Sequence, residues 1–221
     1  MGRDWYEACA RRFGGYRKLW DSRVEGENGE VAFTEWLRQT IPSHPRVLDV
    51  GCGDGLYTLH MSALAEHITG IDFSPEMIAL AHRNQQSAAI ENVTFHVGTT
   101  STDHLPFADQ QFDLIYSRRG PGSHLRDARR ILKPGGLVAG IHTGARQEIL
   151  ERLTTHGFEV LINQEYRGRE VFPSLTDYAL FLSRMPGAPD YTLPENEAAL
   201  LEHVSGDGYA ADRWWFIWVA R

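Results

Sequence analysis

The chain has 221 residues and a formal net charge of −7, with 42% hydrophobic and 23% charged residues. This composition is ordinary for a soluble globular protein, and the length favours one domain with an embellishment. The acidic balance argues against a polyanionic partner such as nucleic acid, which proteins bind through clustered lysine and arginine side chains.

The sequence has two cysteines, Cys9 and Cys52. They form neither a metal-ligand pattern nor a disulfide framework, so we expect no metal site and a reducing compartment. The first residues, MGRDWYEACARRF, lack the apolar stretch of a signal peptide, and the longest apolar run, Trp214–Ala220, is too short to cross a bilayer. These features predict a cytoplasmic protein that does not span a membrane.

Residues 1–45 are predicted to form two helices, Asp4–Trp20 and Glu30–Gln39, around the polar loop DSRVEGENGE. We expect this segment to act as a helical lid, in which Tyr6, Tyr16 and Trp20 either cover the site or simply pack on the core. The acidic residues of EGENGE are expected to be solvated, with binding of a positive ligand as the alternative.

Residues 46–166 alternate short apolar segments with helical patterns, which predicts a doubly wound parallel α/β sheet with right-handed crossovers. The predicted strands are Arg46–Val50, His67–Asp72, Val93–Val97, Phe112–Tyr116, Leu137–His142 and Gly157–Tyr166. The predicted helices are Leu56–Glu66, Ser74–Ser87, 123–132 and Gln147–His156, the second with Ser74 as N-cap and Pro75 in its first position. The segment KPGG (Lys133–Gly136) is predicted to be a turn.

Residues 167–210 interrupt this alternation with prolines and two short amphipathic helices, and residues 211–221 are predicted to be the last strand. We therefore divide a single domain into an N-terminal helical lid (1–45), a cofactor-binding core (46–166), a substrate-cap insertion (167–210) and a last strand (211–221). The tryptophans Trp214, Trp215 and Trp218 are expected to be core residues.

The stretch VLDVGCGDG places Gly51, Gly53 and Gly55 directly after a buried strand and before a helix. Glycine allows a sharp turn and lets a ligand approach main-chain N–H groups. Asp72 ends the next strand, where a carboxylate accepts hydrogen bonds from ribose hydroxyls in doubly wound sheets. The pattern therefore predicts a nucleoside-bearing cofactor, and Asp54 inside it would repel a pyrophosphate but not a cofactor with an amino acid and a sulfonium.

The segments VLDVGCGDG, GIDFSPEMI, LPFADQQFDLIYS and ILKPGG, in this order, resemble class I S-adenosylmethionine-dependent methyltransferases, in particular the type 11 group that acts on small molecules. The resemblance covers residues 45–142. It implies a Rossmann-like, seven-stranded sheet whose last strand is antiparallel and inserted between the fifth and sixth, with N-terminal helices and a helical insertion before that last strand.

The resemblance also implies a set of residues around S-adenosyl-L-methionine. Gly51, Gly53 and Gly55 would line its methionine end beside Asp49, and Asp72 would hold the ribose. Phe73 and Met77 would pack on the adenine. Cys52, in the same loop, is explained by its small size, and Ser117 follows the fourth strand near the cofactor.

The loop after the third predicted strand departs from the family pattern. The group often has an aspartate directly after the glycine of this strand, where it accepts a hydrogen bond from the adenine amino group. Here the sequence is GTTSTDH, with Thr99 at that position and Asp103 further along. Either Thr99, Thr100 and Ser101 contact the adenine, or Asp103 does.

The acceptor is expected at the carboxyl ends of the strands. Candidates there are Arg118 and Arg119, one of which would bind an anionic substrate or the cofactor carboxylate unless it merely pairs with a surface carboxylate. His142 is expected to be a wall residue, with a role as general base as the alternative, and His124 is expected to be structural. Because methyl transfer needs chiefly alignment and exclusion of water, no catalytic residue is assigned.

The favoured function is methylation of a small molecule at O, N or C. The rivals are a nucleic-acid methyltransferase, a nicotinamide-dependent oxidoreductase and an S-adenosylmethionine-binding protein without activity. The negative net charge and the end of the fourth strand, YSRRGP, argue against a nucleic-acid methyltransferase. The G-x-G-x-G spacing argues against a nicotinamide-dependent oxidoreductase. The identity of the acceptor and the oligomeric state are not encoded in a recognisable motif.

Overall fold

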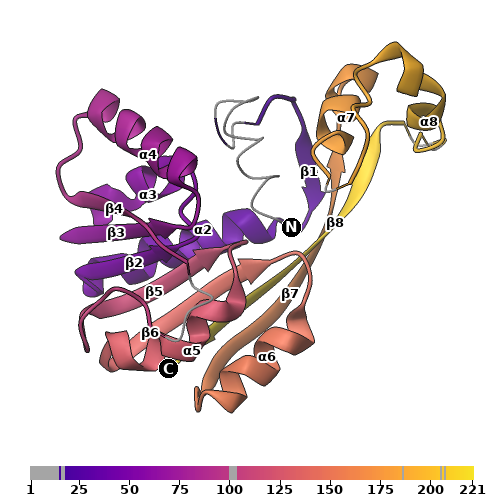
Figure 1. The fold of residues 1–221 in the computed structure, drawn as a ribbon. Coiled ribbons are helices and arrows are strands. Elements are labelled where there is room, and N and C mark those ends of the chain that lie inside the picture. Colours follow the sequence, from indigo (N-terminus) through magenta and orange to yellow (C-terminus); the bar gives the residue numbers. More distant parts are fainter. Residues whose placement is uncertain (1–14, 16–17, 100–103, 186, 205, 207) are drawn as a thin grey trace.

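The computed structural model describes residues 15, 18–99, 104–185, 187–204, 206 and 208–221. Figure 1 shows its elements in chain order. The strands are β1 (Arg23–Gly26), β2 (Arg46–Val50), β3 (His67–Asp72), β4 (Val93–Val97), β5 (Phe112–Arg118), β6 (Leu132–His142), β7 (Val160–Val171) and β8 (Ala210–Ala220). The α-helices are α2 (Gly29–Thr40), α3 (Leu56–Met61), α4 (Pro75–Ala88), α5 (Leu125–Ile131), α6 (Arg146–Thr155), α7 (Leu175–Leu182) and α8 (Glu197–Leu201). Short 3-10 helices are η1 (Ile41–Ser43), η2 (Ser62–Leu64), η3 (Gly122–His124) and η4 (Pro194–Asn196).

The described strands form one eight-stranded sheet in the order β1-β7-β8-β6-β5-β2-β3-β4. The strands from β6 to β4 in this order pair in parallel, whereas β8 is antiparallel to both β6 and β7. The predicted α/β fold is confirmed, including an antiparallel last strand inserted between β6 and β7.

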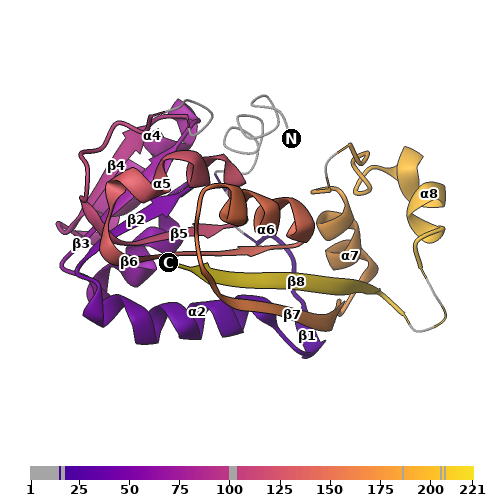
Figure 2. The ribbon, with the colours of Figure 1, turned by 90° about the horizontal axis from the view of Figure 1, so that it is seen from below.

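Helices cover both faces of the sheet, and Figure 2 shows α2 and α6 on opposite sides. One core cluster joins the sheet to α2, α3 and α4 through residues such as Phe33, Leu59 and Ile78. The other joins the opposite face to α5 and α6 through Leu125 and Ile149. The central parallel strands β2, β3 and β5 are therefore buried on both faces, as their nearly continuous apolar sequences predict.

The helix starts follow the capping residues in the sequence. Ser74 caps α4 by accepting a hydrogen bond from the N–H of Met77, with Pro75 in the first position. Asn28 caps α2 in the same way and accepts hydrogen bonds from the N–H groups of Glu30 and Val31. Part of the polar EGENGE segment is thus the capping turn of α2.

The predicted count of seven strands is wrong by one, because the polar loop between the two predicted N-terminal helices contains β1. This strand, RVEG, pairs antiparallel with the end of β7, from Arg23 opposite Val171 to Gly26 opposite Gly168. It has no apolar run of its own, and its ladder with β7 holds it in the sheet. The predicted helix Asp4–Trp20 lies largely outside the described residues.

Further boundaries differ from the prediction, among them those of β7 and β6. Strand β7 begins at Val160 and continues to Val171, five residues beyond the predicted end at Tyr166. The KPGG segment belongs to β6 as an irregularity in its pairing, since Leu132 lies opposite Phe112 while Leu137 lies opposite Leu114. Gly135 there has a φ of +79°, the left-handed conformation that motivated the predicted turn.

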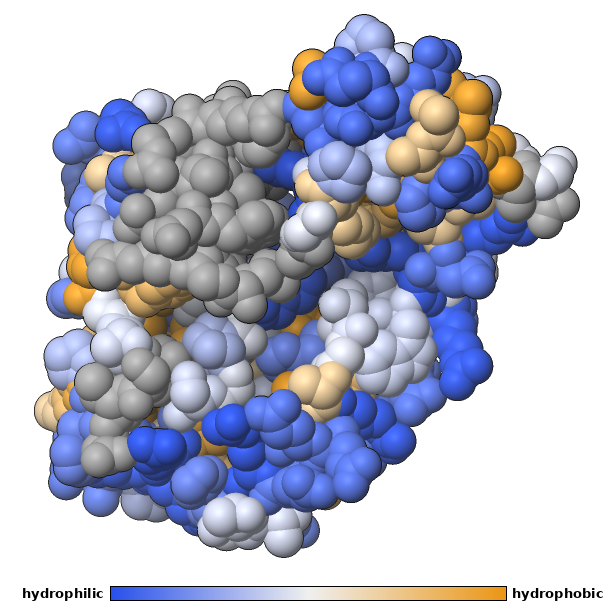
Figure 3. Space-filling model, turned by 45° about the vertical axis from the view of Figure 1, so that its right-hand side comes forward, coloured by the Kyte–Doolittle hydropathy of each residue, from blue (hydrophilic) through white to orange (hydrophobic). Residues whose placement is uncertain are grey.

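The upper ends of β7 and β8 carry a helical lobe, defined here as residues 172–209, which contains α7, η4 and α8 (Figure 1). Its own apolar cluster includes Phe172, Tyr178, Phe181 and Leu200. Apolar atoms gather on this lobe at the upper right of Figure 3, and Leu193 and Leu201 are exposed there. No helix among the described residues is long and apolar enough to cross a membrane.

Candidate cofactor site

The predicted site residues gather at the carboxyl ends of β2, β3, β5 and β6, which pair side by side in the sheet. The glycine loop, defined here as Gly51–Gly55, follows β2 and leads directly into α3. Asp72 ends β3, while Ser117 and Arg118 end β5. The topology thus brings together residues that are far apart in the sequence.

The three glycines of the loop all have left-handed backbone conformations, with φ of +78° at Gly51, +54° at Gly53 and +72° at Gly55. Space is restricted at two of them as well. A Cβ atom on Gly55 would lie 2.6 Å from the ring of Phe95, and one on Gly51 would lie 3.1 Å from the Cα of Gly120. The glycines are therefore required by the fold of the chain itself.

Main-chain N–H groups of the glycine loop already donate within the protein. Those of Gly51 and Cys52 donate to the carbonyl of Ile71, at 2.8 and 3.2 Å, and that of Gly55 donates to the carbonyl of Cys52 at 3.0 Å. The N–H of Gly53 donates to Oδ2 of Asp72 at 3.0 Å. The loop therefore does not present these groups as a nest for a phosphate, contrary to the expectation that a ligand sits on them.

Asp72 is buried, and its carboxylate joins the glycine loop to α4. Besides Gly53, it accepts a hydrogen bond from the N–H of Ser74 at 2.9 Å. Burial raises the pKa of Asp72, while these two hydrogen bonds act against that rise. Each carboxylate oxygen still has lone-pair capacity for a ligand hydroxyl.

Asp49 is the most deeply buried acid of the site, with 2% of its surface exposed. Its Oδ2 accepts hydrogen bonds from the hydroxyls of Thr58 at 2.6 Å and Tyr116 at 2.9 Å. Burial raises the pKa of Asp49 to about 6, although both hydrogen bonds favour the ionised form. Asp49 is thus a carboxylate whose charge is sensitive to pH in the physiological range.

Asp54 places a third buried carboxylate beside this group. Its Oδ1 accepts a hydrogen bond from the N–H of Leu56 at the start of α3, at 3.3 Å. Its side chain also lies against Gly15, so that a Cβ atom on this glycine would collide with the carboxylate. Asp49, Asp54 and Asp72 together make the loop region rich in hydrogen-bond acceptors and negative charge.

Cys52 and Ser117 have structural explanations in this arrangement. Cys52 is buried, burial raises the pKa of its thiol, and its Sγ would lie 3.0 Å from a Cβ atom on Gly70. Small size is thus what the position requires. The hydroxyl of Ser117 is buried and donates to the carbonyl of Val50 at 3.0 Å, which ties β5 to the start of the glycine loop.

The residues predicted to contact adenine lie around the start of α4 and the end of β4. Phe73 is half-buried between β3 and α4, and Met77 is fully buried in the first turn of α4. Thr99 is exposed and follows the end of β4. Thr100, Ser101 and Asp103 lie outside the described residues.

The two arginines of SRRGP meet a carboxylate from α2. Nε of Arg118 donates to Oε2 of Glu30 at 2.7 Å, and Nε of Arg119 lies 3.2 Å from Oε1 of the same side chain. Burial pushes the pKa of Glu30 up, but Arg119 and Arg118 outweigh it and hold that pKa below its usual value. The guanidinium of Arg118 also stacks 4.5 Å from the centre of the Tyr57 ring.

His142 ends β6 and stacks on Trp218 of β8 with an angle of 5° between the rings. His124, from η3, also stacks on Trp218, and its Nδ1 lies 2.7 Å from the carbonyl oxygen of Pro121. Burial lowers the pKa of each histidine to about 4, so both are neutral near pH 7. The Nε2 atoms of both histidines are buried and have no hydrogen-bond partner among the described residues.

Sequence reasoning missed several residues that build this site. Thr58 and Tyr116 hydrogen-bond Asp49, and Glu30 binds both arginines. The partners of Tyr116 and Glu30 lie far away in the sequence, so no local pattern marks these two residues. Among the described residues, no group of three or more histidine, cysteine or acidic side chains is arranged to hold a metal ion.

Comparisons with known proteins agree with the geometry. Residues 47–136 match the family model of a methyltransferase domain. A Bacillus subtilis protein named uncharacterized methyltransferase YcgJ is 33% identical over 144 residues, which is 62% of this chain and 55% of that protein. Demethylmenaquinone methyltransferase of Staphylococcus aureus is 30% identical over 135 residues, or 57% of this chain and 50% of the relative.

A solved structure, described as a functionally unknown protein from Deinococcus radiodurans R1, has the same fold with a TM-score of 0.74 and 24% identity, and the match covers 99% of both chains. The chain spans about half the length of the curated relatives it matches. For residues 47–136, the resemblance to methyltransferases that the sequence predicted is therefore confirmed.

Proposed function

We propose that this protein transfers a methyl group from S-adenosyl-L-methionine to a small-molecule acceptor. The observation that carries the proposal is the chemistry of the glycine loop: the N–H groups of Gly51, Cys52, Gly53 and Gly55 are used within the protein, and three buried carboxylates surround them. A dinucleotide needs free N–H groups for its pyrophosphate, whereas an adenosyl amino acid offers hydroxyls, an ammonium and a sulfonium. The site suits the second ligand.

Each part of the cofactor has a candidate partner. We assign Asp72 to the ribose hydroxyls and Asp49, with its buried carboxylate, to the positive methionine end beside the main chain of Gly51, Gly53 and Gly55. Phe73 offers an apolar face to the adenine, and Met77 follows in the first turn of α4. Cys52 and Ser117 contribute by letting β2, β3 and β5 pack closely beneath the cofactor.

The reaction requires that the acceptor atom approach the methyl group in line with the carbon–sulfur bond. Bound S-adenosylmethionine supplies the methyl group as an electrophile. The protein aligns the two reactants and excludes water, and a base is needed only where the acceptor must lose a proton. We leave the general base unassigned, because the Nε2 of His142 is buried and so is not open to an acceptor in this conformation.

We place acceptor selection in residues 1–45 and in the insertion before β8, which includes the helical lobe. Arg118 and Arg119 are the charged candidates at that side of the site. Glu30 neutralises part of their charge, so an anionic acceptor group would have to share the pair with it. A small acceptor is in keeping with the name of the demethylmenaquinone methyltransferase relative.

The proposal is tested by titration calorimetry of the purified protein with S-adenosylhomocysteine and, separately, with NAD. We expect saturable binding of the first and none of the second. Transfer of a labelled methyl group, or slow hydrolysis of labelled S-adenosylmethionine, then separates an enzyme from a protein that only binds the cofactor. Binding of NAD alone would overturn the proposal.

A matched pair of variants links the binding to the site. Asp72→Asn should weaken S-adenosylhomocysteine binding by about 1–3 kcal/mol, the scale of hydrogen bonds to a charged group. Asp113→Asn is the control, because Asp113 is the second residue of β5 and accepts hydrogen bonds from the main-chain N–H of Arg46 and from Lys133, at the amino end of the strand and away from the site. It should leave the affinity unchanged.

A further inference from the structure

A cavity of about 450 Å³ lies around the amino ends of three neighbouring strands. It is lined by the first residues of β2, β3 and β5, which are Arg46, His67 and Phe112. The residues assigned to S-adenosylmethionine lie at the carboxyl ends of these strands. A volume of this size is typical of sites for small molecules. The cavity is therefore a candidate site for a second ligand, away from the cofactor.

The register of the sheet places several polar side chains of the cavity on one face. Arg46 lies opposite His67, while Thr69 lies opposite Leu48 on one side and Thr94 on the other. Leu48 belongs to the core cluster under α5 and α6, which identifies the face. Helix α4 packs on the other face, and the described residues between β4 and β5 form no helix. This part of the sheet is therefore open, and polar side chains occupy it.

Thr69 distinguishes the cavity from an ordinary solvated surface, because its side chain is 4% exposed. Within the described part of the chain its hydroxyl has no hydrogen-bond partner, yet it is not one of the completely buried unpaired polar atoms. The little surface that Thr69 exposes therefore includes the hydroxyl, and it opens into the cavity. A hydroxyl in such a position is costly unless a ligand or solvent bonds to it.

Arg46 supplies a positive charge that no described acid neutralises through an ion pair. Its main-chain N–H donates to Oδ2 of Asp113 at 2.9 Å, but its guanidinium remains available. Burial, and then the charge of Arg46, lower the pKa of His67. Nε2 of His67 lies 3.0 Å from the hydroxyl of Thr94, which holds both side chains beside the cavity. Glu66 is the only acid among the lining residues, and it is exposed.

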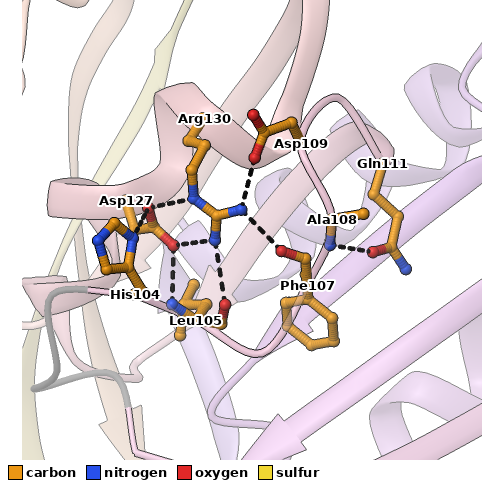
Figure 4. A network of polar contacts seen from close by, with 8 residues as sticks. All are labelled: His104, Leu105, Phe107, Ala108, Asp109, Gln111, Asp127 and Arg130. Carbon is orange, nitrogen blue, oxygen red and sulfur yellow. Dashed lines mark hydrogen bonds and ion pairs between the residues drawn. The ribbon is translucent and has the colours of Figure 1, made fainter.

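The opposite wall is formed by the segment before β5, and Figure 4 shows how it is held. Oε1 of Gln111 accepts a hydrogen bond from the N–H of Ala108 at 2.9 Å, which leaves the amide NH₂ of Gln111 as a donor. Arg130 donates to the carbonyl of Phe107 at 2.7 Å. The ring of Phe107 packs edge-on against His96, which also lines the cavity. The wall is thus fixed by several interactions.

We propose that this cavity binds a phosphate group, either free or as the monoester of a small molecule. The guanidinium of Arg46, the hydroxyl of Thr69 and the amide of Gln111 donate to its oxygens from different sides. A phosphate accepts hydrogen bonds in several directions, whereas the two oxygens of a carboxylate lie in one plane. The volume leaves room for an organic part beside the phosphate. This site is separate from methyl transfer and does not depend on it.

The test uses titration calorimetry at constant ionic strength with sodium phosphate, glycerol 3-phosphate and, as the uncharged probe, glycerol. We expect saturable binding of a phosphate compound and none of glycerol. Tighter binding of glycerol 3-phosphate supports a monoester as the ligand, and equal binding of both supports free phosphate. Absence of saturation with both phosphate compounds would overturn the proposal.

Two variants locate the binding, each with a matched control. Arg46→Gln and Thr69→Val should weaken the binding of phosphate compounds by about tenfold, the scale of a lost hydrogen bond to a charged group. Valine keeps the shape of threonine, and thermal unfolding checks that both variants are folded. The controls Arg152→Gln and Thr154→Val should bind as the unmodified protein does, because both residues lie in α6, where Arg152 pairs with Glu148.

The two sites are separated by a competition experiment. Saturating S-adenosylhomocysteine should leave the affinity for phosphate compounds within twofold, and all four variants should keep their affinity for S-adenosylhomocysteine. Equal phosphate binding in Arg46→Gln, in Thr69→Val and in the unmodified protein would refute the site. Competition between the two ligands would place the phosphate at the carboxyl ends of the strands and would also refute it.

Discussion

Different interactions hold together the helical lobe and the cofactor edge, which is defined here as the glycine loop and the carboxyl ends of β2, β3, β5 and β6. At the cofactor edge, the glycine loop is held by main-chain hydrogen bonds and by Asp72, and left-handed glycines set its path. In the helical lobe, packed aromatic rings such as Phe172, Tyr178 and Phe181 hold short helices together. A loop that depends on left-handed glycines requires a strict sequence pattern, whereas a cluster of packed side chains tolerates many sequences of similar volume.

The lobe is nevertheless tied to the rest of the protein by specific side chains. The indole of Trp20 packs edge-on against Phe181 at 5.6 Å and donates to Glu170 at 3.3 Å. Arg213 of β8 lies 3.3 Å from the same glutamate. Because Trp20 comes just before β1, it joins the described segment around β1 to the lobe on this side of the sheet.

The largest effect should come from the cofactor edge. Gly55→Val places a branched side chain at a φ of +72° and within 2.6 Å of Phe95. Strain and overpacking together should lower the free energy of unfolding by about 4 kcal/mol. Gly187→Val is the control in the lobe, where φ is +80° but no atom lies within 4 Å of the new Cβ. It should cost about 1–2 kcal/mol, and equal losses in urea denaturation would show that packing does not constrain the loop.

Trp20→Ala tests whether the lobe is independent of the cofactor edge. We expect a loss of about 2–3 kcal/mol in the free energy of unfolding, because a half-buried indole and its hydrogen bond are removed. The affinity for S-adenosylhomocysteine should change by less than twofold. A tenfold loss of affinity in the same variant would mean that the two regions act as one site.

Acid pH should destabilise the protein through the histidines that stack on Trp218. Their folded-state pKa is about 4, below the unfolded value near 6.5, so protonation favours the unfolded chain. The contribution of neutral His124 to the free energy of unfolding is therefore fully present above pH 6.5 and is lost as pH falls. The loss should amount to about 2 kcal/mol between pH 7 and pH 5. His124→Asn keeps a donor for the carbonyl of Pro121 and should remove this share of the pH dependence in thermal unfolding. If the variant and the unmodified protein lost stability equally between pH 7 and pH 5, His124 would not be a source of the acid sensitivity.

The smallest predicted effect concerns cofactor affinity and pH. Because the pKa of Asp49 is raised to about 6, its carboxylate is ionised at pH 7.5 and mostly protonated at pH 5. Protonation removes the charge that attracts the methionine end, so S-adenosylhomocysteine should bind about tenfold more weakly at pH 5. In Asp49→Asn the affinity should be lower at pH 7.5 and flat over this range. A wild-type profile without a step near pH 6 would exclude Asp49 from this role.

The sequence was sufficient to predict three of the parallel strands to the residue. Strands β2, β3 and β4 have the predicted bounds, because each is a short apolar run that polar or turn-forming residues end on both sides. The start of α4 followed from Ser74 and Pro75 for the same reason. These signals are local and do not depend on distant partners.

The features that sequence reasoning missed depend on distant partners. Strand β1 is stabilised by β7, about 145 residues away along the chain, and the polar end of β7 is a strand because β1 and β8 flank it. The loop N–H groups of Gly51 and Cys52 bond to Ile71 on the neighbouring strand, which the spacing of glycines does not reveal. In the same way, the pairing of Glu30 with Arg118 joins α2 to β5.

A crystal structure of the protein with S-adenosylhomocysteine tests the central claim most directly. We expect the ribose hydroxyls within hydrogen-bonding distance of the Asp72 carboxylate, and the homocysteine end beside Asp49 and the glycine loop. The sulfur should face the side of the sheet where Arg118 and the helical lobe lie. Density for the ligand anywhere else, or none in crystals soaked at a concentration that saturates binding in solution, would contradict it.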